Sequence, residues 1–148
     1  VTIPDANFVT WLQANVPSAM SGNQMDTTSL VVTTRTIIDV EDLGITNLNG
    51  IQYFDSLKTL DCGNKNLTVN PNGLTTLSIL PSTLDSLICG NIGLTVLPLL
   101  PNSLKLLKCY SNQLNTLPLL PVNLFYLNCA GNQISSLPIL PNNFKPSG

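Results

Sequence analysis

The stretch LPLLPNSLKLLKCYSNQLNT at residues 97–116 is followed directly by LPLLPVNLFYLNCAGNQISS at residues 117–136. Both segments share the pattern LPLLPxxLxxLxCxxNQ, so the sequence repeats itself with a period of 20 residues. Related but less regular copies begin at residues 77 and 137. A fixed period of this length indicates stacked structural units, none of which can bury its apolar side alone. We therefore expect a solenoid with one continuous core.

Within each period the motif L-x-x-L-x-C recurs, at residues 57–62, 84–89, 104–109 and 124–129. It resembles the leucine-rich repeat consensus L-x-x-L-x-L-x-x-N/C-x-L, with cysteine in the third apolar position. Strand alternation turns the leucine and cysteine of each x-L-x-C segment inward. The predicted fold is an α/β solenoid, a leucine-rich repeat horseshoe fragment. It has an N-terminal helical cap, about five parallel strands on the concave face and a mostly irregular or polyproline-like convex side.

The chain divides into a cap at residues 1–35 and repeats at residues 36–148. The repeats have a period of 20–22 residues, with a seven-residue insertion near residues 68–74 and a truncated last copy that begins at Phe144. In the cap, Asp5 is a plausible N-cap for a short amphipathic helix. We expect this helix to cover the first coil with four apolar side chains, Phe8, Trp11, Leu12 and Val16.

The asparagine position of the consensus, three residues after the cysteine, is occupied by Asn112 and Asn132 in the last two full coils. Such an asparagine satisfies backbone groups at the bend after the strand. Earlier coils have Leu43, Lys65 and Ile92 at this position. We therefore expect an irregular bend in the N-terminal half.

The composition excludes several functions. Only 9 % of the residues are charged, the net charge is −2 and there is no histidine, so nucleic-acid binding is not expected and the commonest general base is missing. No apolar run reaches the roughly 20 residues of a membrane span. The spacings between Cys62, Cys89, Cys109 and Cys129 are 27, 20 and 20 residues, whereas zinc sites use close pairs. We expect buried, reduced thiols, with pairwise oxidation as the alternative, and no metal, cofactor or catalytic residue.

The candidate binding residues are the outward strand positions, because the strand-lined face is the usual binding surface of a solenoid. Ile88, Leu106, Tyr110 and Tyr126 form a predicted apolar and aromatic cluster there. The remaining candidates on this face are polar: Asp39, Asp61, Lys108 and Asn128. An incidental acidic patch is favoured over a metal site where Asp39 and Asp61 lie side by side with Glu41 near.

The sequence also resembles known bacterial families. IPDANF at residues 3–8 and the segment at residues 43–54 resemble the start of secreted leucine-rich repeat proteins of Bacteroidetes-type bacteria and the capped repeat domains of internalins. The cysteine of L-x-x-L-x-C is similar to that of cysteine-ladder internalins, and L-P-x-L-P-x-x-L resembles the short repeats of secreted bacterial effectors.

This resemblance implies a secreted or cell-surface protein that acts in adhesion or protein recognition. We expect a non-enzymatic module that is monomeric, forms part of a longer polypeptide and binds a protein or a glycan through its concave face. Two alternatives stay open. One is a structural spacer with no ligand of its own, and the other is a metal-assisted enzyme acting through Asp39, Glu41 and Asp61.

Overall fold

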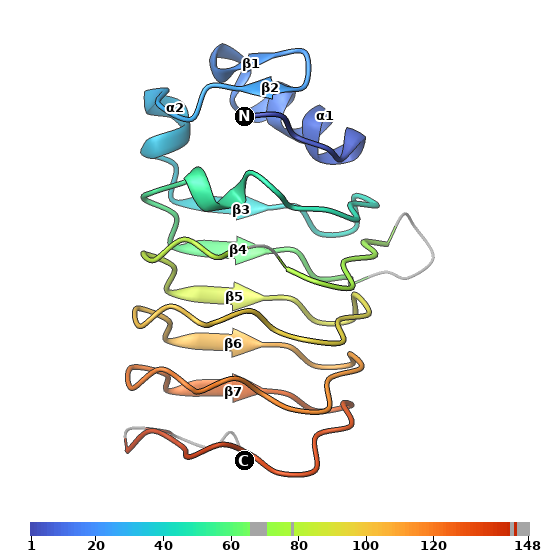
Figure 1. Cartoon of the computed structure of the whole chain (residues 1–148), viewed down its shortest axis with the longest axis vertical. Helices are drawn as coiled ribbons and strands as arrows, with labels where there is room; N and C mark the ends of the chain where they lie inside the picture. The colour runs from blue at the N-terminus through green and yellow to red at the C-terminus, as the bar shows by residue number, and fades with distance from the viewer. Residues whose placement is uncertain (66–70, 78, 143, 145–148) are drawn as a thin grey trace.

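The computed structural model describes residues 1–65, 71–77, 79–142 and 144. The N-terminal part contains α1 (Ala6–Asn15), the 3-10 turn η1 (Pro17–Ala19), β1 (Met20–Ser21), β2 (Gln24–Met25) and α2 (Leu30–Thr33). The stacked part contains β3 (Ile37–Asp39), η2 (Ile51–Tyr53), β4 (Thr59–Asp61), β5 (Ser86–Ile88), β6 (Leu106–Lys108) and β7 (Tyr126–Asn128). Figure 1 shows the N-terminal elements above β3 and the C-terminus at the opposite end of the stack.

The strands β3 to β7 form one sheet in sequence order, and every neighbouring pair is parallel. Each coil therefore contributes one strand and returns on the other side of the stack. The central residues of the strands are aligned in one row, Ile38, Leu60, Leu87, Leu107 and Leu127. The longer step from β4 to β5 does not disturb this register. The prediction of a solenoid with about five parallel strands is confirmed.

The row of central strand residues is buried, together with the cysteines that follow the strands. Cys62, Cys89 and Cys109 are fully buried, and Cys129 in the last coil is half-buried. Leucines that precede the strands, such as Leu84 and Leu104, complete this side of the core. The inward direction predicted for L-x-x-L-x-C is therefore confirmed.

The N-terminal helix caps the first coil as expected. The Asp5 carboxylate accepts a hydrogen bond from the Phe8 N–H at 2.8 Å, and its other oxygen accepts two from Thr46 in the first coil. Burial of Asp5 opposes its charge, but the hydrogen bonds from Thr46 and Phe8 outweigh that effect and lower the pKa of the carboxyl. Phe8 and Leu12 are fully buried, and Arg35 lies over the half-buried ring of Trp11 at 5.0 Å. One side chain thus caps the helix and ties it to the repeats.

The bends after the strands are more regular than the sequence predicts. Asp42, Asn91, Ser111 and Gly131 each lie two residues after the inward residue that follows a strand, and all four have positive φ. Two of these bends belong to the first and third coils, where an irregular bend is expected. The expectation is therefore wrong for these two coils, which share the left-handed residue of the later coils without the consensus asparagine. It holds for the second coil, where Asn64 at the equivalent position does not have a positive φ.

Asn64 and Asn72 explain how the first two coils manage without a consensus asparagine. The Asn72 side chain donates to the carbonyls of Val40 and Cys62 and accepts from the Ile45 N–H. Asn64 in turn hydrogen-bonds the Asn72 backbone at both its N–H and its carbonyl. The predicted insertion near residues 68–74 lies partly outside the described residues, which resume at position 71. Its described part supplies the buried amide that the consensus position lacks.

The return segments run opposite the sheet and carry the LPLLP motif. In the coil after β6, Leu117 and Leu120 point into the core, whereas Leu119 between them is exposed. The same alternation holds for Leu97 and Leu99 in the preceding coil. The stack therefore has two broad surfaces, the strand face formed by the outward residues of β3–β7, and the return face formed by the outward residues of these segments.

Candidate functional site

The sheet register brings the outward residues of the strand face into two columns. The first column consists of the residues that begin the strands, Ile37, Thr59, Ser86, Leu106 and Tyr126. The second column consists of the residues that end them, Asp39, Asp61, Ile88, Lys108 and Asn128. Neighbouring strands lie about 4.8 Å apart, so consecutive members of a column are in contact range. All of the candidate residues on the strands thus belong to one surface.

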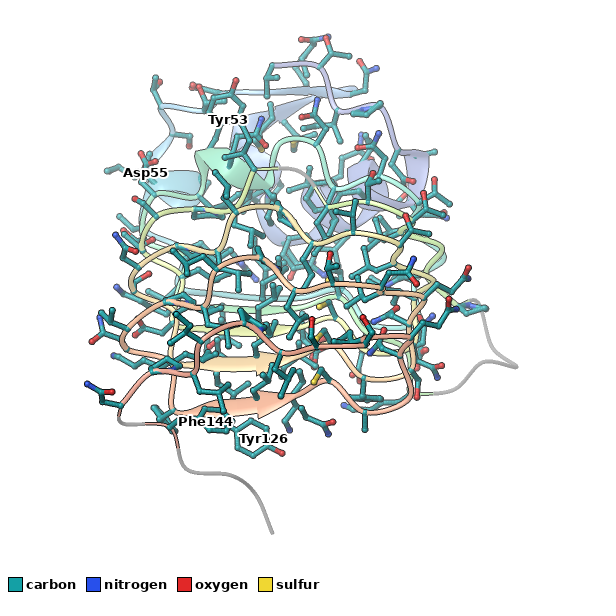
Figure 2. The ribbon with its side chains drawn as sticks, turned by 60° about the horizontal axis from the view of Figure 1, so that its bottom comes forward. Tyr53, Asp55, Tyr126 and Phe144 are labelled. Carbon is teal, nitrogen blue, oxygen red and sulfur yellow. The ribbon has the colours of Figure 1, made fainter. Side chains whose placement is uncertain are left out.

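Apolar and aromatic side chains gather where this surface crosses β6 and β7. Leu106 is paired with Tyr126, and both are half-buried. The Lys108 ammonium lies 5.9 Å from the centre of the Tyr126 ring, which is within the range of a cation–π contact. Tyr126 is labelled at the C-terminal end of the stack in Figure 2, close to Phe144 in that view. Phe125, an exposed residue directly before Tyr126, is not indicated by the sequence pattern. It lies outside the x-L-x positions from which the outward residues were predicted.

Tyr110 follows β6 and lies against the preceding coil. A Cβ atom added at Gly90 would lie 2.5–2.7 Å from the atoms of the Tyr110 ring, closer than side chains approach. The ring therefore rests on the Gly90 backbone, and only glycine leaves room for it there. Ile88 lies two residues before Gly90, at the end of β5, and is paired with Lys108 of β6. Ile88 is therefore on the same face of the sheet as the Leu106–Tyr126 pair, whereas the Tyr110 ring lies against the coil on the other side of β6 from Tyr126. A single cluster of all four side chains stays a prediction.

The opposite end of the strand face is acidic. Asp39 and Asp61 are paired across β3 and β4, and carboxylate oxygens of Asp39, Glu41 and Asp61 lie within 4.8 Å of one another. Lys65 forms an ion pair with Glu41 at 2.6 Å. Burial, and then the nearby charges of Glu41 and Asp39, raise the pKa of the Asp61 carboxyl, although a hydrogen bond from the Gly63 N–H opposes the shift.

These three carboxylates are the one group of potential metal ligands among the described residues. Each of these carboxylates already accepts a hydrogen bond from a group of the chain itself. Asp39 accepts from the Glu41 N–H, Asp61 from the Gly63 N–H and Glu41 from Lys65. An acidic patch held by backbone N–H groups and one lysine explains the arrangement without an ion.

The cysteine column has no features of a reactive site. Burial raises the pKa of the Cys62 and Cys89 thiols, and it raises the pKa of Cys109 to about 12. Thiolates are the reactive form of cysteine, so these side chains behave as small apolar core residues. All four are free thiols in the structure.

Within the described residues, no helix has both the length and the apolar character needed to cross a membrane. The parallel coils, the inward L-x-x-L-x-C residues and the asparagine hydrogen bonds at the bends define a leucine-rich repeat solenoid. A scan against protein-family models and a search of curated proteins both gave no match.

Among solved structures, the chain is similar to YopM from Yersinia enterocolitica WA-314, with 30 % sequence identity and a TM-score of 0.41. The similar region covers 61 % of this chain and 28 % of the YopM chain.

Proposed function

We propose that this chain is a non-enzymatic protein-recognition module that binds a protein partner through its strand face. The observation that carries the proposal is the group of Leu106, Lys108, Tyr110 and Tyr126, held on adjacent coils of one parallel sheet. Their apolar area is directed away from the core, which is already filled by the leucine and cysteine rows. Tyrosine and aliphatic side chains with one cationic group are typical of the centre of a protein interface.

The charge distribution suggests how a partner is oriented on this face. The carboxylates of Asp39, Glu41 and Asp61 mark one end, and Lys108 marks the other. A partner with basic groups facing β3 and β4 and apolar groups facing β6 and β7 is complementary to this surface. Five strands about 4.8 Å apart span only about 20 Å, so the interface is small compared with the roughly 800 Å² per partner of standard complexes.

The setting proposed for this module is a secreted or cell-surface bacterial protein that acts in adhesion. The support comes from the sequence, in which the segment at residues 3–8 and the repeated L-x-x-L-x-C and L-P-x-L-P motifs resemble secreted and surface-displayed repeat proteins. A buried column of free thiols does not need a particular redox environment, because burial keeps the thiols protonated. The partner is a host or bacterial surface protein.

The test compares the three tyrosines of the chain in a pull-down from a surface-protein extract, or in an adhesion assay. Tyr126→Ala is expected to lower binding at least tenfold, the usual size of a hot-spot loss. Tyr53→Ala is the matched control, because Tyr53 lies on η2 away from the strands (Figure 2) and is 37 % exposed. Binding that survives both Tyr110→Ala and Tyr126→Ala would refute recognition through the strand face and favour the spacer.

A second variant tests the position of one ring without removing it. Gly90→Ala forces the Tyr110 ring to move, because the new methyl group occupies the space of the ring atoms. Gly90 does not have a positive φ, so alanine fits its backbone. Reduced binding by Gly90→Ala with an unchanged circular dichroism spectrum is the expected result.

A further inference from the structure

A column of four exposed aliphatic side chains runs along the return face, independent of the strand face. The column consists of the third residue of each LPLLP-type segment, Ile79, Leu99, Leu119 and Ile139, which are 78, 87, 78 and 87 % exposed. We refer to these four residues as the return ladder. They recur every 20 residues and so occupy successive coils of the stack.

The core does not require apolar residues in the return ladder. In the coil of Leu119, the core contacts of the return segment come from Leu117 and Leu120, which are both buried. A polar residue at position 119 would satisfy the fold equally well and would lower the exposed apolar area. Single exposed leucines are ordinary on protein surfaces, but a contiguous apolar strip is typical of an interaction site.

The return segments that contain the ladder are uncharged. None of the described residues in the segments 75–77, 79–81, 95–101, 115–121 and 135–142 is charged. Prolines stand beside the ladder in each coil, for example Pro118 and Pro121, and fix the backbone before any partner binds. Near its C-terminal end the strip is hollowed, with a cavity of about 460 Å³ lined by Leu119, Val122, Ile139 and Leu140 among others.

We propose that the return ladder is a homodimer interface whose occupant is the return ladder of a second copy of this chain, arranged antiparallel. An uncharged strip with a regular spacing is complemented by another strip of the same chemistry and spacing, and this chain supplies one. A two-fold axis at the middle of the ladder places Leu99 opposite Leu119 of the second copy, and Ile79 opposite its Ile139. Such an isologous contact uses the same patch on both molecules.

Two observations favour the antiparallel over the parallel arrangement. In the antiparallel pair, the hollow beside Leu119 and Ile139 receives Ile79 and Leu99 of the second copy, whereas in the parallel pair it faces an identical hollow. Charge is also sorted along the chain, with eight acidic and three basic side chains through Asp85, net −5, and three lysines after it, net +3. The antiparallel pair places the lysine-bearing end of one copy nearer to the acidic end of the other than the parallel pair does.

The area available is sufficient for a specific contact. At about 100 Å² of apolar surface per aliphatic side chain, the return ladder with Val122, Leu140 and the flanking prolines offers about 600 Å² per copy. The total of about 1,200 Å² lies at the lower end of the range for specific complexes. We therefore expect a dimer that dissociates at low concentration.

The first test is the oligomeric state of the whole chain, measured by sedimentation velocity over a range of concentrations. The wild type is expected to show a reversible monomer–dimer equilibrium, and Leu119→Glu to weaken it at least tenfold. Leu30→Glu is the matched control, because Leu30 on α2 is also exposed, at 76 %, but lies in the N-terminal cap. Circular dichroism and thermal melting verify that both variants fold.

A wild type that stays monomeric at millimolar concentration, as the sequence alone leads us to expect, would overturn the proposal. A dimer that is equally strong in Leu119→Glu, or equally weakened by Leu30→Glu, would also overturn it.

Disulfide cross-linking tests the antiparallel alignment. A mixture of Leu99→Cys and Leu119→Cys chains is expected to form a mixed disulfide under mild oxidation, faster than either variant forms one with itself. The native cysteines are expected to react more slowly than the introduced ones, because three of them are fully buried and the fourth is half-buried with a raised pKa. Preferential self-linking of Leu119→Cys would show a parallel pair and overturn the alignment.

Discussion

Asn112 provides the sharpest test of how the coils are held together. Its side chain is buried at the bend after β6 and makes six hydrogen bonds to backbone groups of two adjacent coils. The side-chain oxygen accepts from Ile92, Gly93 and Leu94 at 3.0–3.2 Å, and the two hydrogens of the amide nitrogen are shared among the carbonyls of Cys89, Cys109 and Tyr110 at 2.8–3.3 Å. One side-chain amide thus provides hydrogen-bond partners for backbone groups that are not paired within a helix or a sheet.

Asn112→Ala removes all six of these hydrogen bonds and leaves a small polar cavity. A buried polar group without a partner costs about 1–3 kcal/mol, and a water molecule that enters the cavity restores part of this loss. We expect the free energy of unfolding to fall by about 3 kcal/mol. For a chain of this size that loss corresponds to a fall in Tm of about 6–12 °C.

Thermal and urea denaturation followed by circular dichroism measure this change. Asn115→Ala is the control, because Asn115 lies in the same coil and is exposed, and its loss is expected to stay within about 0.5 kcal/mol. Asn112→Asp retains the acceptor but loses the three donated hydrogen bonds and buries a charge, so it is also expected to destabilise. A stability of Asn112→Ala equal to that of Asn115→Ala would refute the role of the amide.

Three further predictions concern single residues. Asn72→Ala removes three buried side-chain hydrogen bonds and is expected to lower the free energy of unfolding by about 2 kcal/mol. Urea denaturation measures this change, and an unchanged stability would contradict a stabilising role of the Asn72 amide. The raised pKa of Asp61 means that the folded state holds its proton more tightly than the unfolded state, so stability falls as pH rises through that pKa. Asp61→Asn is therefore expected to raise Tm at pH 7 and to lose this advantage below the ordinary value of 3.8; parallel Tm curves against pH would contradict this. In native protein treated with iodoacetamide, mass spectrometry is expected to find Cys129 alkylated first, because the other three thiols are fully buried; early labelling of Cys62 would contradict the packing.

Much of the fold could be predicted because the sequence repeats. The x-L-x-C segments set one strand per coil, and their spacing set the register that pairs Asp39 with Asp61 and Leu106 with Tyr126. Strand alternation has only two possible outcomes for each side chain, so a single buried leucine fixes the direction of its neighbours. The outward residues of the strand face therefore follow from the sequence.

The asparagine network could not be predicted in the same way. The repeat consensus places the asparagine three residues after the cysteine, and Lys65 occupies that position in the second coil. Asn72 reaches the first two coils from within the predicted insertion, which interrupts the 20-residue period, so its place does not follow from the spacing of the cysteines. An insertion that occurs in one coil gives no periodic signal from which this placement could be derived.

The direction of the return ladder could not be predicted either, for a different reason. LPLLP contains three leucines in five residues, and neither a helical nor a strand period assigns one of them to the outside. Polyproline-like backbone has three residues per turn, which places the first and fourth positions, such as Leu117 and Leu120, on one side. Leu119 then points to solvent because both neighbouring leucines already fill the core. Since the same geometry repeats in every coil, the apolar residues at this position form a strip along the stack. Each added repeat lengthens the surface that a second copy can cover.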